Sequence, residues 1–236
     1  MSEKHILDHL HKYMFLQNVC LDRVSKPTNT DFFVKETTSP ILSSNKIFVP
    51  GEKDKLFWCF FIMRNGLDKY LSIGQNHFQV ETSTKFGIAE SLKDNEILLK
   101  QNKLKRDVIE NELVNEKIIT MEGLKALCVL HNVNVLVILK NMFYKISGLS
   151  DSETLVIEQD KNGEFGIVDS ICEERKQNIF NNYYEILDYK KKIKNISAYK
   201  LDELKSIAEK FSITLVDNIG NKKTKKKLYE EITMQF

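Results

Sequence analysis

The spacing of apolar positions changes about halfway through residues 51–189. From Thr84 to Leu113, apolar side chains recur every three or four residues, which predicts two helices with a break near residues 101–102. The same spacing predicts a third helix from Thr120 to Leu130, with the Thr120 side chain as its N-cap. Leu56–Met63 is apolar throughout, so its pattern fits a buried helix and a buried strand equally well.

Strand patterns dominate after Leu130. Val133–Leu139 is rich in Val and Ile and predicts a central strand, with Phe143–Ile146 as its hairpin partner. A second hairpin is predicted where the turn sequence Asp160–Gly163 separates Thr154–Glu158 from Phe165–Val168. Helices followed by paired strands are typical of an α+β domain rather than of alternating βαβ units.

Three further elements complete the predicted body. Short strands are expected at Lys46–Val49 and Phe78–Glu81, and a helix is expected over Glu173–Tyr189. Residues 3–17 also have helical spacing, and all three prolines follow within residues 25–50. The chain is therefore divided into an N-terminal helix with an irregular segment (1–50), an α+β body (51–189) of helices and β-hairpins, and a small all-α tail of two helices (190–236).

The first tail helix is predicted after Ser197, a good N-cap residue. Leu201, Leu204 and Ala208 form one apolar stripe along it. A turn at Gly220 leads to a second helix, in which Thr224 is the expected N-cap and Leu228 and Ile232 face inward. Such short helices are stable only if they bury a shared core, and these apolar positions supply a small one.

Charge is unevenly distributed along the chain. The whole sequence carries +2, but residues 190–236 hold twelve Lys and six acidic residues, a net charge of +6. The preceding 189 residues carry −4. A basic tail on a mildly acidic body indicates that any contact with a polyanion involves the C-terminal segment.

Five tail lysines precede or begin the second helix: Lys222, Lys223, Lys225, Lys226 and Lys227. Free backbone N–H groups and the helix dipole both favour phosphate at such a position, and Thr224 lies among these lysines. Lys rather than Arg indicates point-charge contact with the backbone of DNA or RNA, with little sequence readout. Two alternatives stay open: docking to another protein, and a solvated helix face.

The tail resembles the helix–extended–helix modules of the SAP and Rho-terminator N-terminal-like group. The similarity lies in the segments YKLDELKSIAEKFSI and GNKKTKKKLYEEI and covers about forty residues. It implies binding to DNA or RNA, or a small protein-docking function. The whole lysine-rich chain also looks like uncharacterised proteins of large cytoplasmic DNA viruses, which implies viral protein partners and a location in the host cytoplasm or the virion.

A cysteine peptidase is the enzymatic alternative. Cys59 lies in an apolar run, and papain-like and deubiquitinase-like enzymes place their nucleophile at the start of a buried helix. His131 and His77 each precede a predicted strand and are the candidate bases. No Gly or Asn that would form an oxyanion hole flanks Cys59, so a buried structural cysteine is the preferred interpretation.

No other chemistry is indicated by the sequence. His5 and His9 are one helical turn apart near His11, but no Cys or HExxH-type Glu completes a metal site, so no metal is predicted. No nucleotide-binding loop is present, and no cofactor is expected. The dispersed cysteines, and the absence of a signal peptide or an apolar run long enough to cross a bilayer, indicate an intracellular protein without membrane contact.

Overall fold

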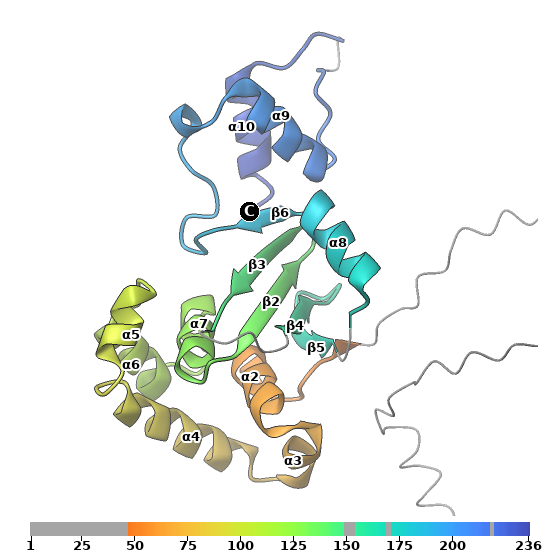
Figure 1. Ribbon diagram of the computed structural model, residues 1–236. Coiled ribbons are helices and arrows are strands. Elements are labelled where there is room, and N and C mark those ends of the chain that lie inside the picture. Colours follow the sequence, from red (N-terminus) through yellow and green to blue (C-terminus); the bar gives the residue numbers. More distant parts are fainter. Residues whose placement is uncertain (1–46, 149–153, 169–170, 218–219) are drawn as a thin grey trace, which may run out of the picture. The chain divides into compact units, whose positions relative to one another are not determined.

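The computed structural model describes residues 47–148, 154–168, 171–217 and 220–236, which belong to one compact unit. Within these residues the protein is α+β, with helices on both faces of a mixed sheet (Figure 1). The helix predicted over residues 3–17, together with His5, His9, His11 and Cys20, lies outside the described residues.

The ambiguous run Leu56–Met63 forms a helix, α2 (Lys55–Asn65). The Asp54 carboxylate caps it by accepting a hydrogen bond from the amide of Phe57 at 3.1 Å. The helix ends at Gly66, which has a φ of +87° that side-chain-bearing residues rarely adopt. All seven residues from Leu56 to Ile62 are buried, which explains why the run shows no amphipathic period.

The next five helices of the body are α3 (Leu67–Ser72), α4 (His77–Ser91), α5 (Glu96–Gln101), α6 (Arg106–Asn115) and α7 (Met121–Leu130). The predicted strand Phe78–Glu81 is wrong, because these residues form the first turns of α4. The alternation read there is only four residues long. It is outweighed by α4 packing on α6 and by the bonds that Glu81 makes to Trp58 and Lys85. Thr120 caps α7 as predicted.

The sheet has the strand order β1-β5-β4-β2-β3-β6. Both predicted hairpins are confirmed: β2 (Asn134–Leu139) pairs antiparallel with β3 (Met142–Ile146), and β4 (Thr154–Gln159) with β5 (Phe165–Val168). The short strand β1 (Ile47–Phe48) pairs with β5. Neither this pairing nor the two parallel pairings, of β4 with β2 and of β6 with β3, were predicted.

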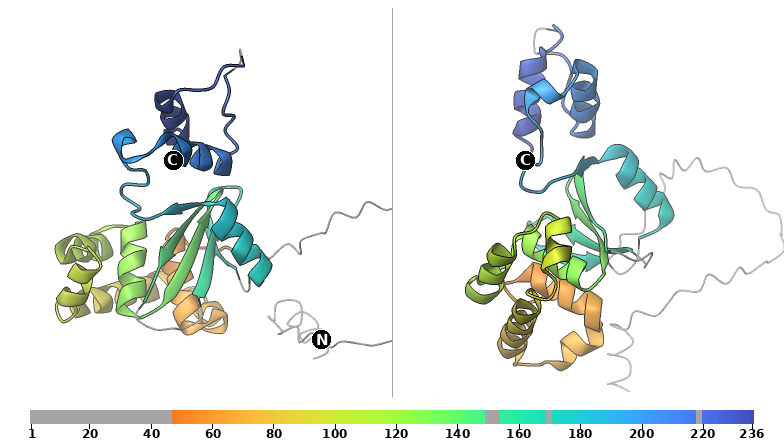
Figure 2. Two further views of the ribbon diagram at one scale, coloured as in Figure 1. Left: turned by 45° about the horizontal axis from the view of Figure 1, so that its top comes forward. Right: turned by 60° about the vertical axis from the view of Figure 1, so that its left-hand side comes forward.

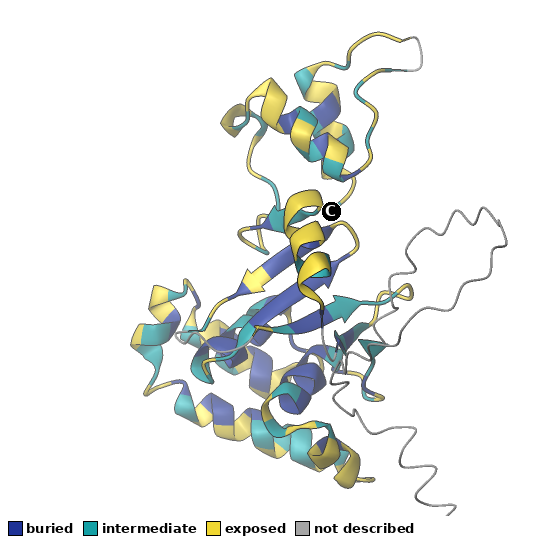
Figure 3. Cartoon of the chain, turned by 45° about the vertical axis from the view of Figure 1, so that its right-hand side comes forward, coloured by how far each residue is buried: buried dark blue, intermediate teal, exposed yellow. Residues whose placement is uncertain are grey.

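Alternating residues of the central strands face two different sets of helices. Val135, Val137 and Tyr144 belong to the main core with α2 and α7. Leu136, Ile138 and Phe143 form a second cluster with Ile179 of α8 (Glu173–Asn182). Further views show α8 on the opposite face of the sheet from α2 and α7 (Figure 2). Figure 3 shows how much of α8 stays exposed while α2 and the central strands are buried.

The predicted helix Glu173–Tyr189 is correct only as far as Asn182, where α8 ends. Tyr184–Ile186 instead forms β6, which pairs with β3 at the sheet edge. Of the aromatic residues in this stretch, Phe180 is in α8, whereas Tyr184 is in β6. Tyr184 is the important one, because its ring packs on Phe211 and Phe236 of the tail at 5.7 and 5.4 Å between centroids.

The tail contains a short 3₁₀ turn η1 (Ile196–Ala198), then α9 (Leu201–Lys210) and α10 (Lys225–Thr233). Ser197 is not the N-cap, because it lies inside η1. α9 begins after Lys200, whose amide donates to the Glu203 carboxylate at 2.6 Å. The predicted tail core is formed by Leu204, Ala208, Leu228 and Ile232, which are all buried, whereas Leu201 is exposed.

Candidate nucleic-acid interface

A small hairpin connects the two tail helices and carries the first two of the five lysines. Val216 and Lys222 form an isolated antiparallel bridge, and the Lys223 amide donates to the Leu215 carbonyl at 2.9 Å. Gly220, with a φ of +86°, lies in the turn, as its position in the sequence predicted. The hairpin thus delivers Lys222 and Lys223 directly to the beginning of α10.

Lys225, Lys226 and Lys227 occupy the first helical turn of α10. The Thr224 hydroxyl caps this turn by accepting the Lys227 amide at 3.4 Å, as predicted for this residue. The amides of Lys225 and Lys226 donate no hydrogen bond to any described residue. The first turn of α10 therefore combines two backbone N–H groups without a described partner, the positive end of the helix dipole and three lysine side chains.

The five lysines differ in what their amines contact. The Lys223 side chain is only 8% exposed, and its amine lies 2.6 Å from Glu231 and 3.2 Å from the Thr214 hydroxyl. The Lys226 side chain is 82% exposed, and its amine is 3.9 Å from Glu230. No ion pair within the described residues involves Lys222, Lys225 or Lys227. Lys223 therefore stabilises the hairpin, and the other four present positive charge to solvent.

Several contacts fix the tail to the sheet edge at β6. The Lys210 amine donates to the Tyr183 carbonyl at 2.8 Å, and the Tyr184 hydroxyl donates to the Lys192 carbonyl at 3.0 Å. Lys190 pairs with Glu122 of α7 at 2.7 Å. The basic residues before α9 are thus held by specific contacts with the body.

Cys59, the candidate nucleophile, lies in the middle of α2 and is fully buried. Its thiol faces the Phe165 carbonyl at 3.8 Å, and no histidine in the described chain contacts it. Burial raises the pKa of the Cys59 thiol well above its usual range, which disfavours the reactive thiolate. Neither the geometry nor the protonation state resembles an activated Cys–His pair.

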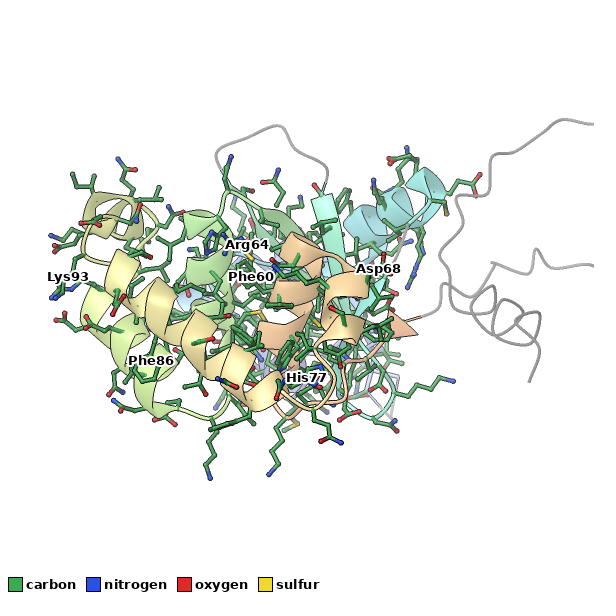
Figure 4. All side chains as sticks on the ribbon, turned by 90° about the horizontal axis from the view of Figure 1, so that it is seen from below. Phe60, Arg64, Asp68, His77, Phe86 and Lys93 are labelled. Atoms are coloured by element: carbon green, nitrogen blue, oxygen red, sulfur yellow. The ribbon has the colours of Figure 1, made fainter. Side chains whose placement is uncertain are left out.

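The two candidate bases contact other side chains. The His77 ring packs against Trp58 and Tyr70, with both centroids 5.0 Å away, and its Nε2 lies 3.3 Å from Glu52. His131 packs on Phe60 and faces Arg64 at 3.2 Å. Desolvation first, and the Arg64 charge second, lower the pKa of its imidazole. Figure 4 shows His77 apart from Arg64, the residue that faces His131. The contacts of Cys59, His77 and His131 involve different partners, so the structure does not join them in one site.

Sequence reasoning missed a buried ionic network at the start of α2. Lys85 on α4 donates to Asp54 at 2.6 Å and to Glu81 at 2.7 Å, while Trp58 Nε1 donates to Glu81 at 2.9 Å. Asp54 also accepts the Ile119 amide at 3.0 Å. Burial raises the pKa of Asp54, and the hydrogen bond and charge of Lys85 oppose that shift. The i, i+4 spacing of Glu81 and Lys85 was a visible signal, but their burial was not.

This network borders a hollow of about 580 Å³ between α4 and the end of α6. Phe78, Phe86 and Val114 line the hollow and are exposed, Phe78 by 82%. Figure 4 labels Phe86 on α4. Lys85, Asp54 and Glu81, which border the hollow, are paired with each other. These three side chains therefore have little hydrogen-bonding capacity left for a ligand.

The described residues contain neither a metal-binding cluster nor a helix that could span a membrane. No group of three or more His, Cys, Asp or Glu side chains there is arranged to hold a metal ion. None of the described helices combines the length and the apolar composition that crossing a bilayer requires.

Comparison with known proteins identifies no relative. The chain matches no protein-family model, and neither the curated proteins nor the solved structures include a significant match.

Proposed function

We propose that this protein binds the phosphate backbone of DNA or RNA through its tail, with low sequence specificity and without catalysing a reaction. The observation that carries the proposal is the first turn of α10. There Lys225, Lys226 and Lys227 form the first turn of the helix, in which two backbone amides donate no hydrogen bond to any described residue. A phosphate at this position accepts hydrogen bonds from the amides while the ammonium groups neutralise its charge.

The different contacts of the lysine amines also support the proposal. The Lys223 amine contacts Glu231 and Thr214, and these contacts stabilise the hairpin. Lys222 belongs to the same hairpin through its bridge with Val216, so it is positioned next to the start of α10. Among the described residues, none of the other four lysines is closely paired with a carboxylate, and the nearest approach is 3.9 Å, from Lys226 to Glu230. Their charge is therefore available for an external anion.

The proposed setting is the host cytoplasm or a virion, where viral proteins would be further partners of the body. This part of the proposal rests on the lysine-rich composition and the overall resemblance to viral proteins. The principal alternative is a protein-docking or virion structural role in which the tail meets no nucleic acid. The exposed apolar side chains around the α4–α6 hollow are the observation that favours it.

The deciding experiment compares two triple variants that remove the same amount of charge. Lys225, Lys226 and Lys227 are changed to Gln in one, and the exposed body lysines Lys93, Lys117 and Lys161 in the other. Binding of fluorescent oligonucleotides is measured by anisotropy at about 50 mM salt, where phosphate contacts are strong. The tail variant should lose about tenfold or more in affinity on every sequence, and the body variant less than about twofold. Equal losses would reject the tail as the binding surface.

A further inference from the structure

A second basic surface lies where the tail meets the edge of the sheet. Here β6 and α9 border a groove of about 470 Å³. Its lining includes four lysines from two segments of the tail (Lys191, Lys192, Lys194 and Lys210), the tyrosines Tyr184 and Tyr199, and the acidic residues Glu185 and Asp188.

The positive charge of this groove is largely uncompensated. The Lys210 amine donates to the main-chain carbonyl of Tyr183, a neutral partner, and the Lys192 amine donates to a main-chain oxygen of the last residue, Phe236, at 3.3 Å. Lys191 and Lys194 are exposed, and their amines have no partner among the described residues.

The two acids of the groove are engaged by other groups. Glu185 pairs with Lys145 of β3 at 3.3 Å, and Asp188 accepts the Lys190 amide at 3.0 Å. Because four lysines line the groove against these two acids, its lining side chains carry a net positive charge.

The lysine segment is held in place by the tyrosines. The Tyr199 hydroxyl accepts the Lys194 amide at 3.1 Å, and the Tyr184 hydroxyl donates to the Lys192 carbonyl at 3.0 Å. Both bonds fix the main chain that bears the amines. The groove is thus a preformed site, and a ligand pays less ordering entropy there than on a mobile loop.

One contact connects the lysine segment beside this groove with the middle of α10. The Tyr229 hydroxyl donates to the Lys194 carbonyl at 2.9 Å. Tyr229 lies three and four residues after Lys226 and Lys225, which places all three on neighbouring positions of the helix surface. Tyr229 thus ties the main chain of the lysine segment to α10.

We propose that this groove is a second phosphate-binding site and that it makes the tail select single-stranded over double-stranded nucleic acid. The inference rests on the proposed function. The phosphates of a duplex lie on the outside of a wide, stiff rod, which does not enter a recess of this size. An unpaired strand bends into the recess, and a positive groove with aromatic side chains is a common design for holding one.

The test measures how affinity depends on salt for a fluorescent oligothymidine of about 20 nucleotides and a duplex of the same length. It uses the intact protein, a groove variant (K191Q/K194Q), the α10 variant (K225Q/K226Q/K227Q) and a body control (K93Q/K161Q). Each lost contact should reduce the slope of log affinity against log salt by about 0.7 on a single strand. The groove variant should therefore lose about 1.4 of slope on the single strand and little on the duplex.

The possible outcomes separate the two proposals. A groove variant that matches the body control on the single strand, while the α10 variant is weakened, would reject the groove and leave the proposed function standing. An equal loss of slope on the duplex would reject the strand selectivity. If intact protein binds neither oligonucleotide at low salt, the proposed function itself fails. Circular dichroism and melting curves check that each variant is folded.

Discussion

Lysine serves opposite purposes in the body and in the tail. Lys85 in the body is 4% exposed, and both of its carboxylate partners lie within 2.7 Å. Lys226 in the tail is 82% exposed, and its nearest carboxylate is 3.9 Å away. The first amine is neutralised within the protein, where its removal would strand buried carboxylates. The second contributes almost nothing to folding and retains its charge for a partner. Burial and pairing, not the number of lysines, decide which region can attract a polyanion.

The largest expected contrast extends this comparison from amines to thiols. Cys59 is fully buried with a raised pKa, whereas Cys172, the residue before α8, is exposed. Iodoacetamide at neutral pH should modify Cys59 about 10³-fold more slowly than Cys172, because Cys59 must wait for the protein to open. Mass spectrometry of peptides over time provides both rates in one sample. Rapid modification of Cys59 that depends on His77 or His131 would instead support the peptidase alternative.

Breaking the buried network should cost the most stability. Lys85→Met leaves Asp54 and Glu81 without their cation, and removing one member of a buried ion pair costs about 3–5 kcal/mol. Lys93→Met, at an exposed position, is the matched control and should change stability by less than about 0.5 kcal/mol. Urea denaturation measures both. A loss below about 1 kcal/mol for Lys85→Met would show that the network is not a structural element.

The same contrast exists within the tail itself. Lys223→Met should destabilise the protein by about 1.5–3 kcal/mol, because it removes charge-assisted bonds to Glu231 and Thr214. Lys226→Met should leave stability nearly unchanged but weaken oligonucleotide binding. Melting curves measure the stability of both variants, and fluorescence anisotropy measures their affinity for the oligonucleotide. Indistinguishable behaviour of the two variants in both measurements would contradict the division between a structural lysine and a binding lysine.

The smallest expected effect concerns the cap of α10. Thr224→Ala removes the hydroxyl that accepts the Lys227 amide and should cost about 1 kcal/mol. Thr224→Ser keeps the hydroxyl and is the control. Binding should weaken less in Thr224→Ala than in the triple lysine variant, because the charges remain. Thermal denaturation of the two variants compares them, and equal stability would argue against the cap.

Local signals in the sequence predicted much of this fold. The helical period found α7 with its cap at Thr120, the Val- and Ile-rich run found the first hairpin, and the turn residues Asp160–Gly163 found the second. The failures arose where distant contacts decide the structure. Phe78–Glu81 has strand-like alternation, but Glu81 bonds with Trp58 across the fold and belongs to a long helix. Tyr184 leaves the predicted helix to pair with β3.

The candidate site shows the same limit. Thr224 and the lysines after it could be located from the sequence, because a cap residue and a charge cluster are local features. Their individual environments could not. Lys223 and Lys226 are the same residue type three positions apart, and only the fold places Glu231 against the first. The groove beside β6 could not be predicted either, because the sequence pattern placed the residues of β6 in a helix over Glu173–Tyr189.

The most direct test of phosphate binding by the tail is the salt dependence of duplex binding by the intact protein. Each phosphate contact contributes about −0.9 to the slope of log affinity against log salt. Contacts from Lys222, Lys225, Lys226 and Lys227 should therefore produce a slope of about −3 to −4, which the triple Gln variant reduces by about 2–3. A slope near zero, or one that the triple variant leaves unchanged, would contradict phosphate binding by the tail.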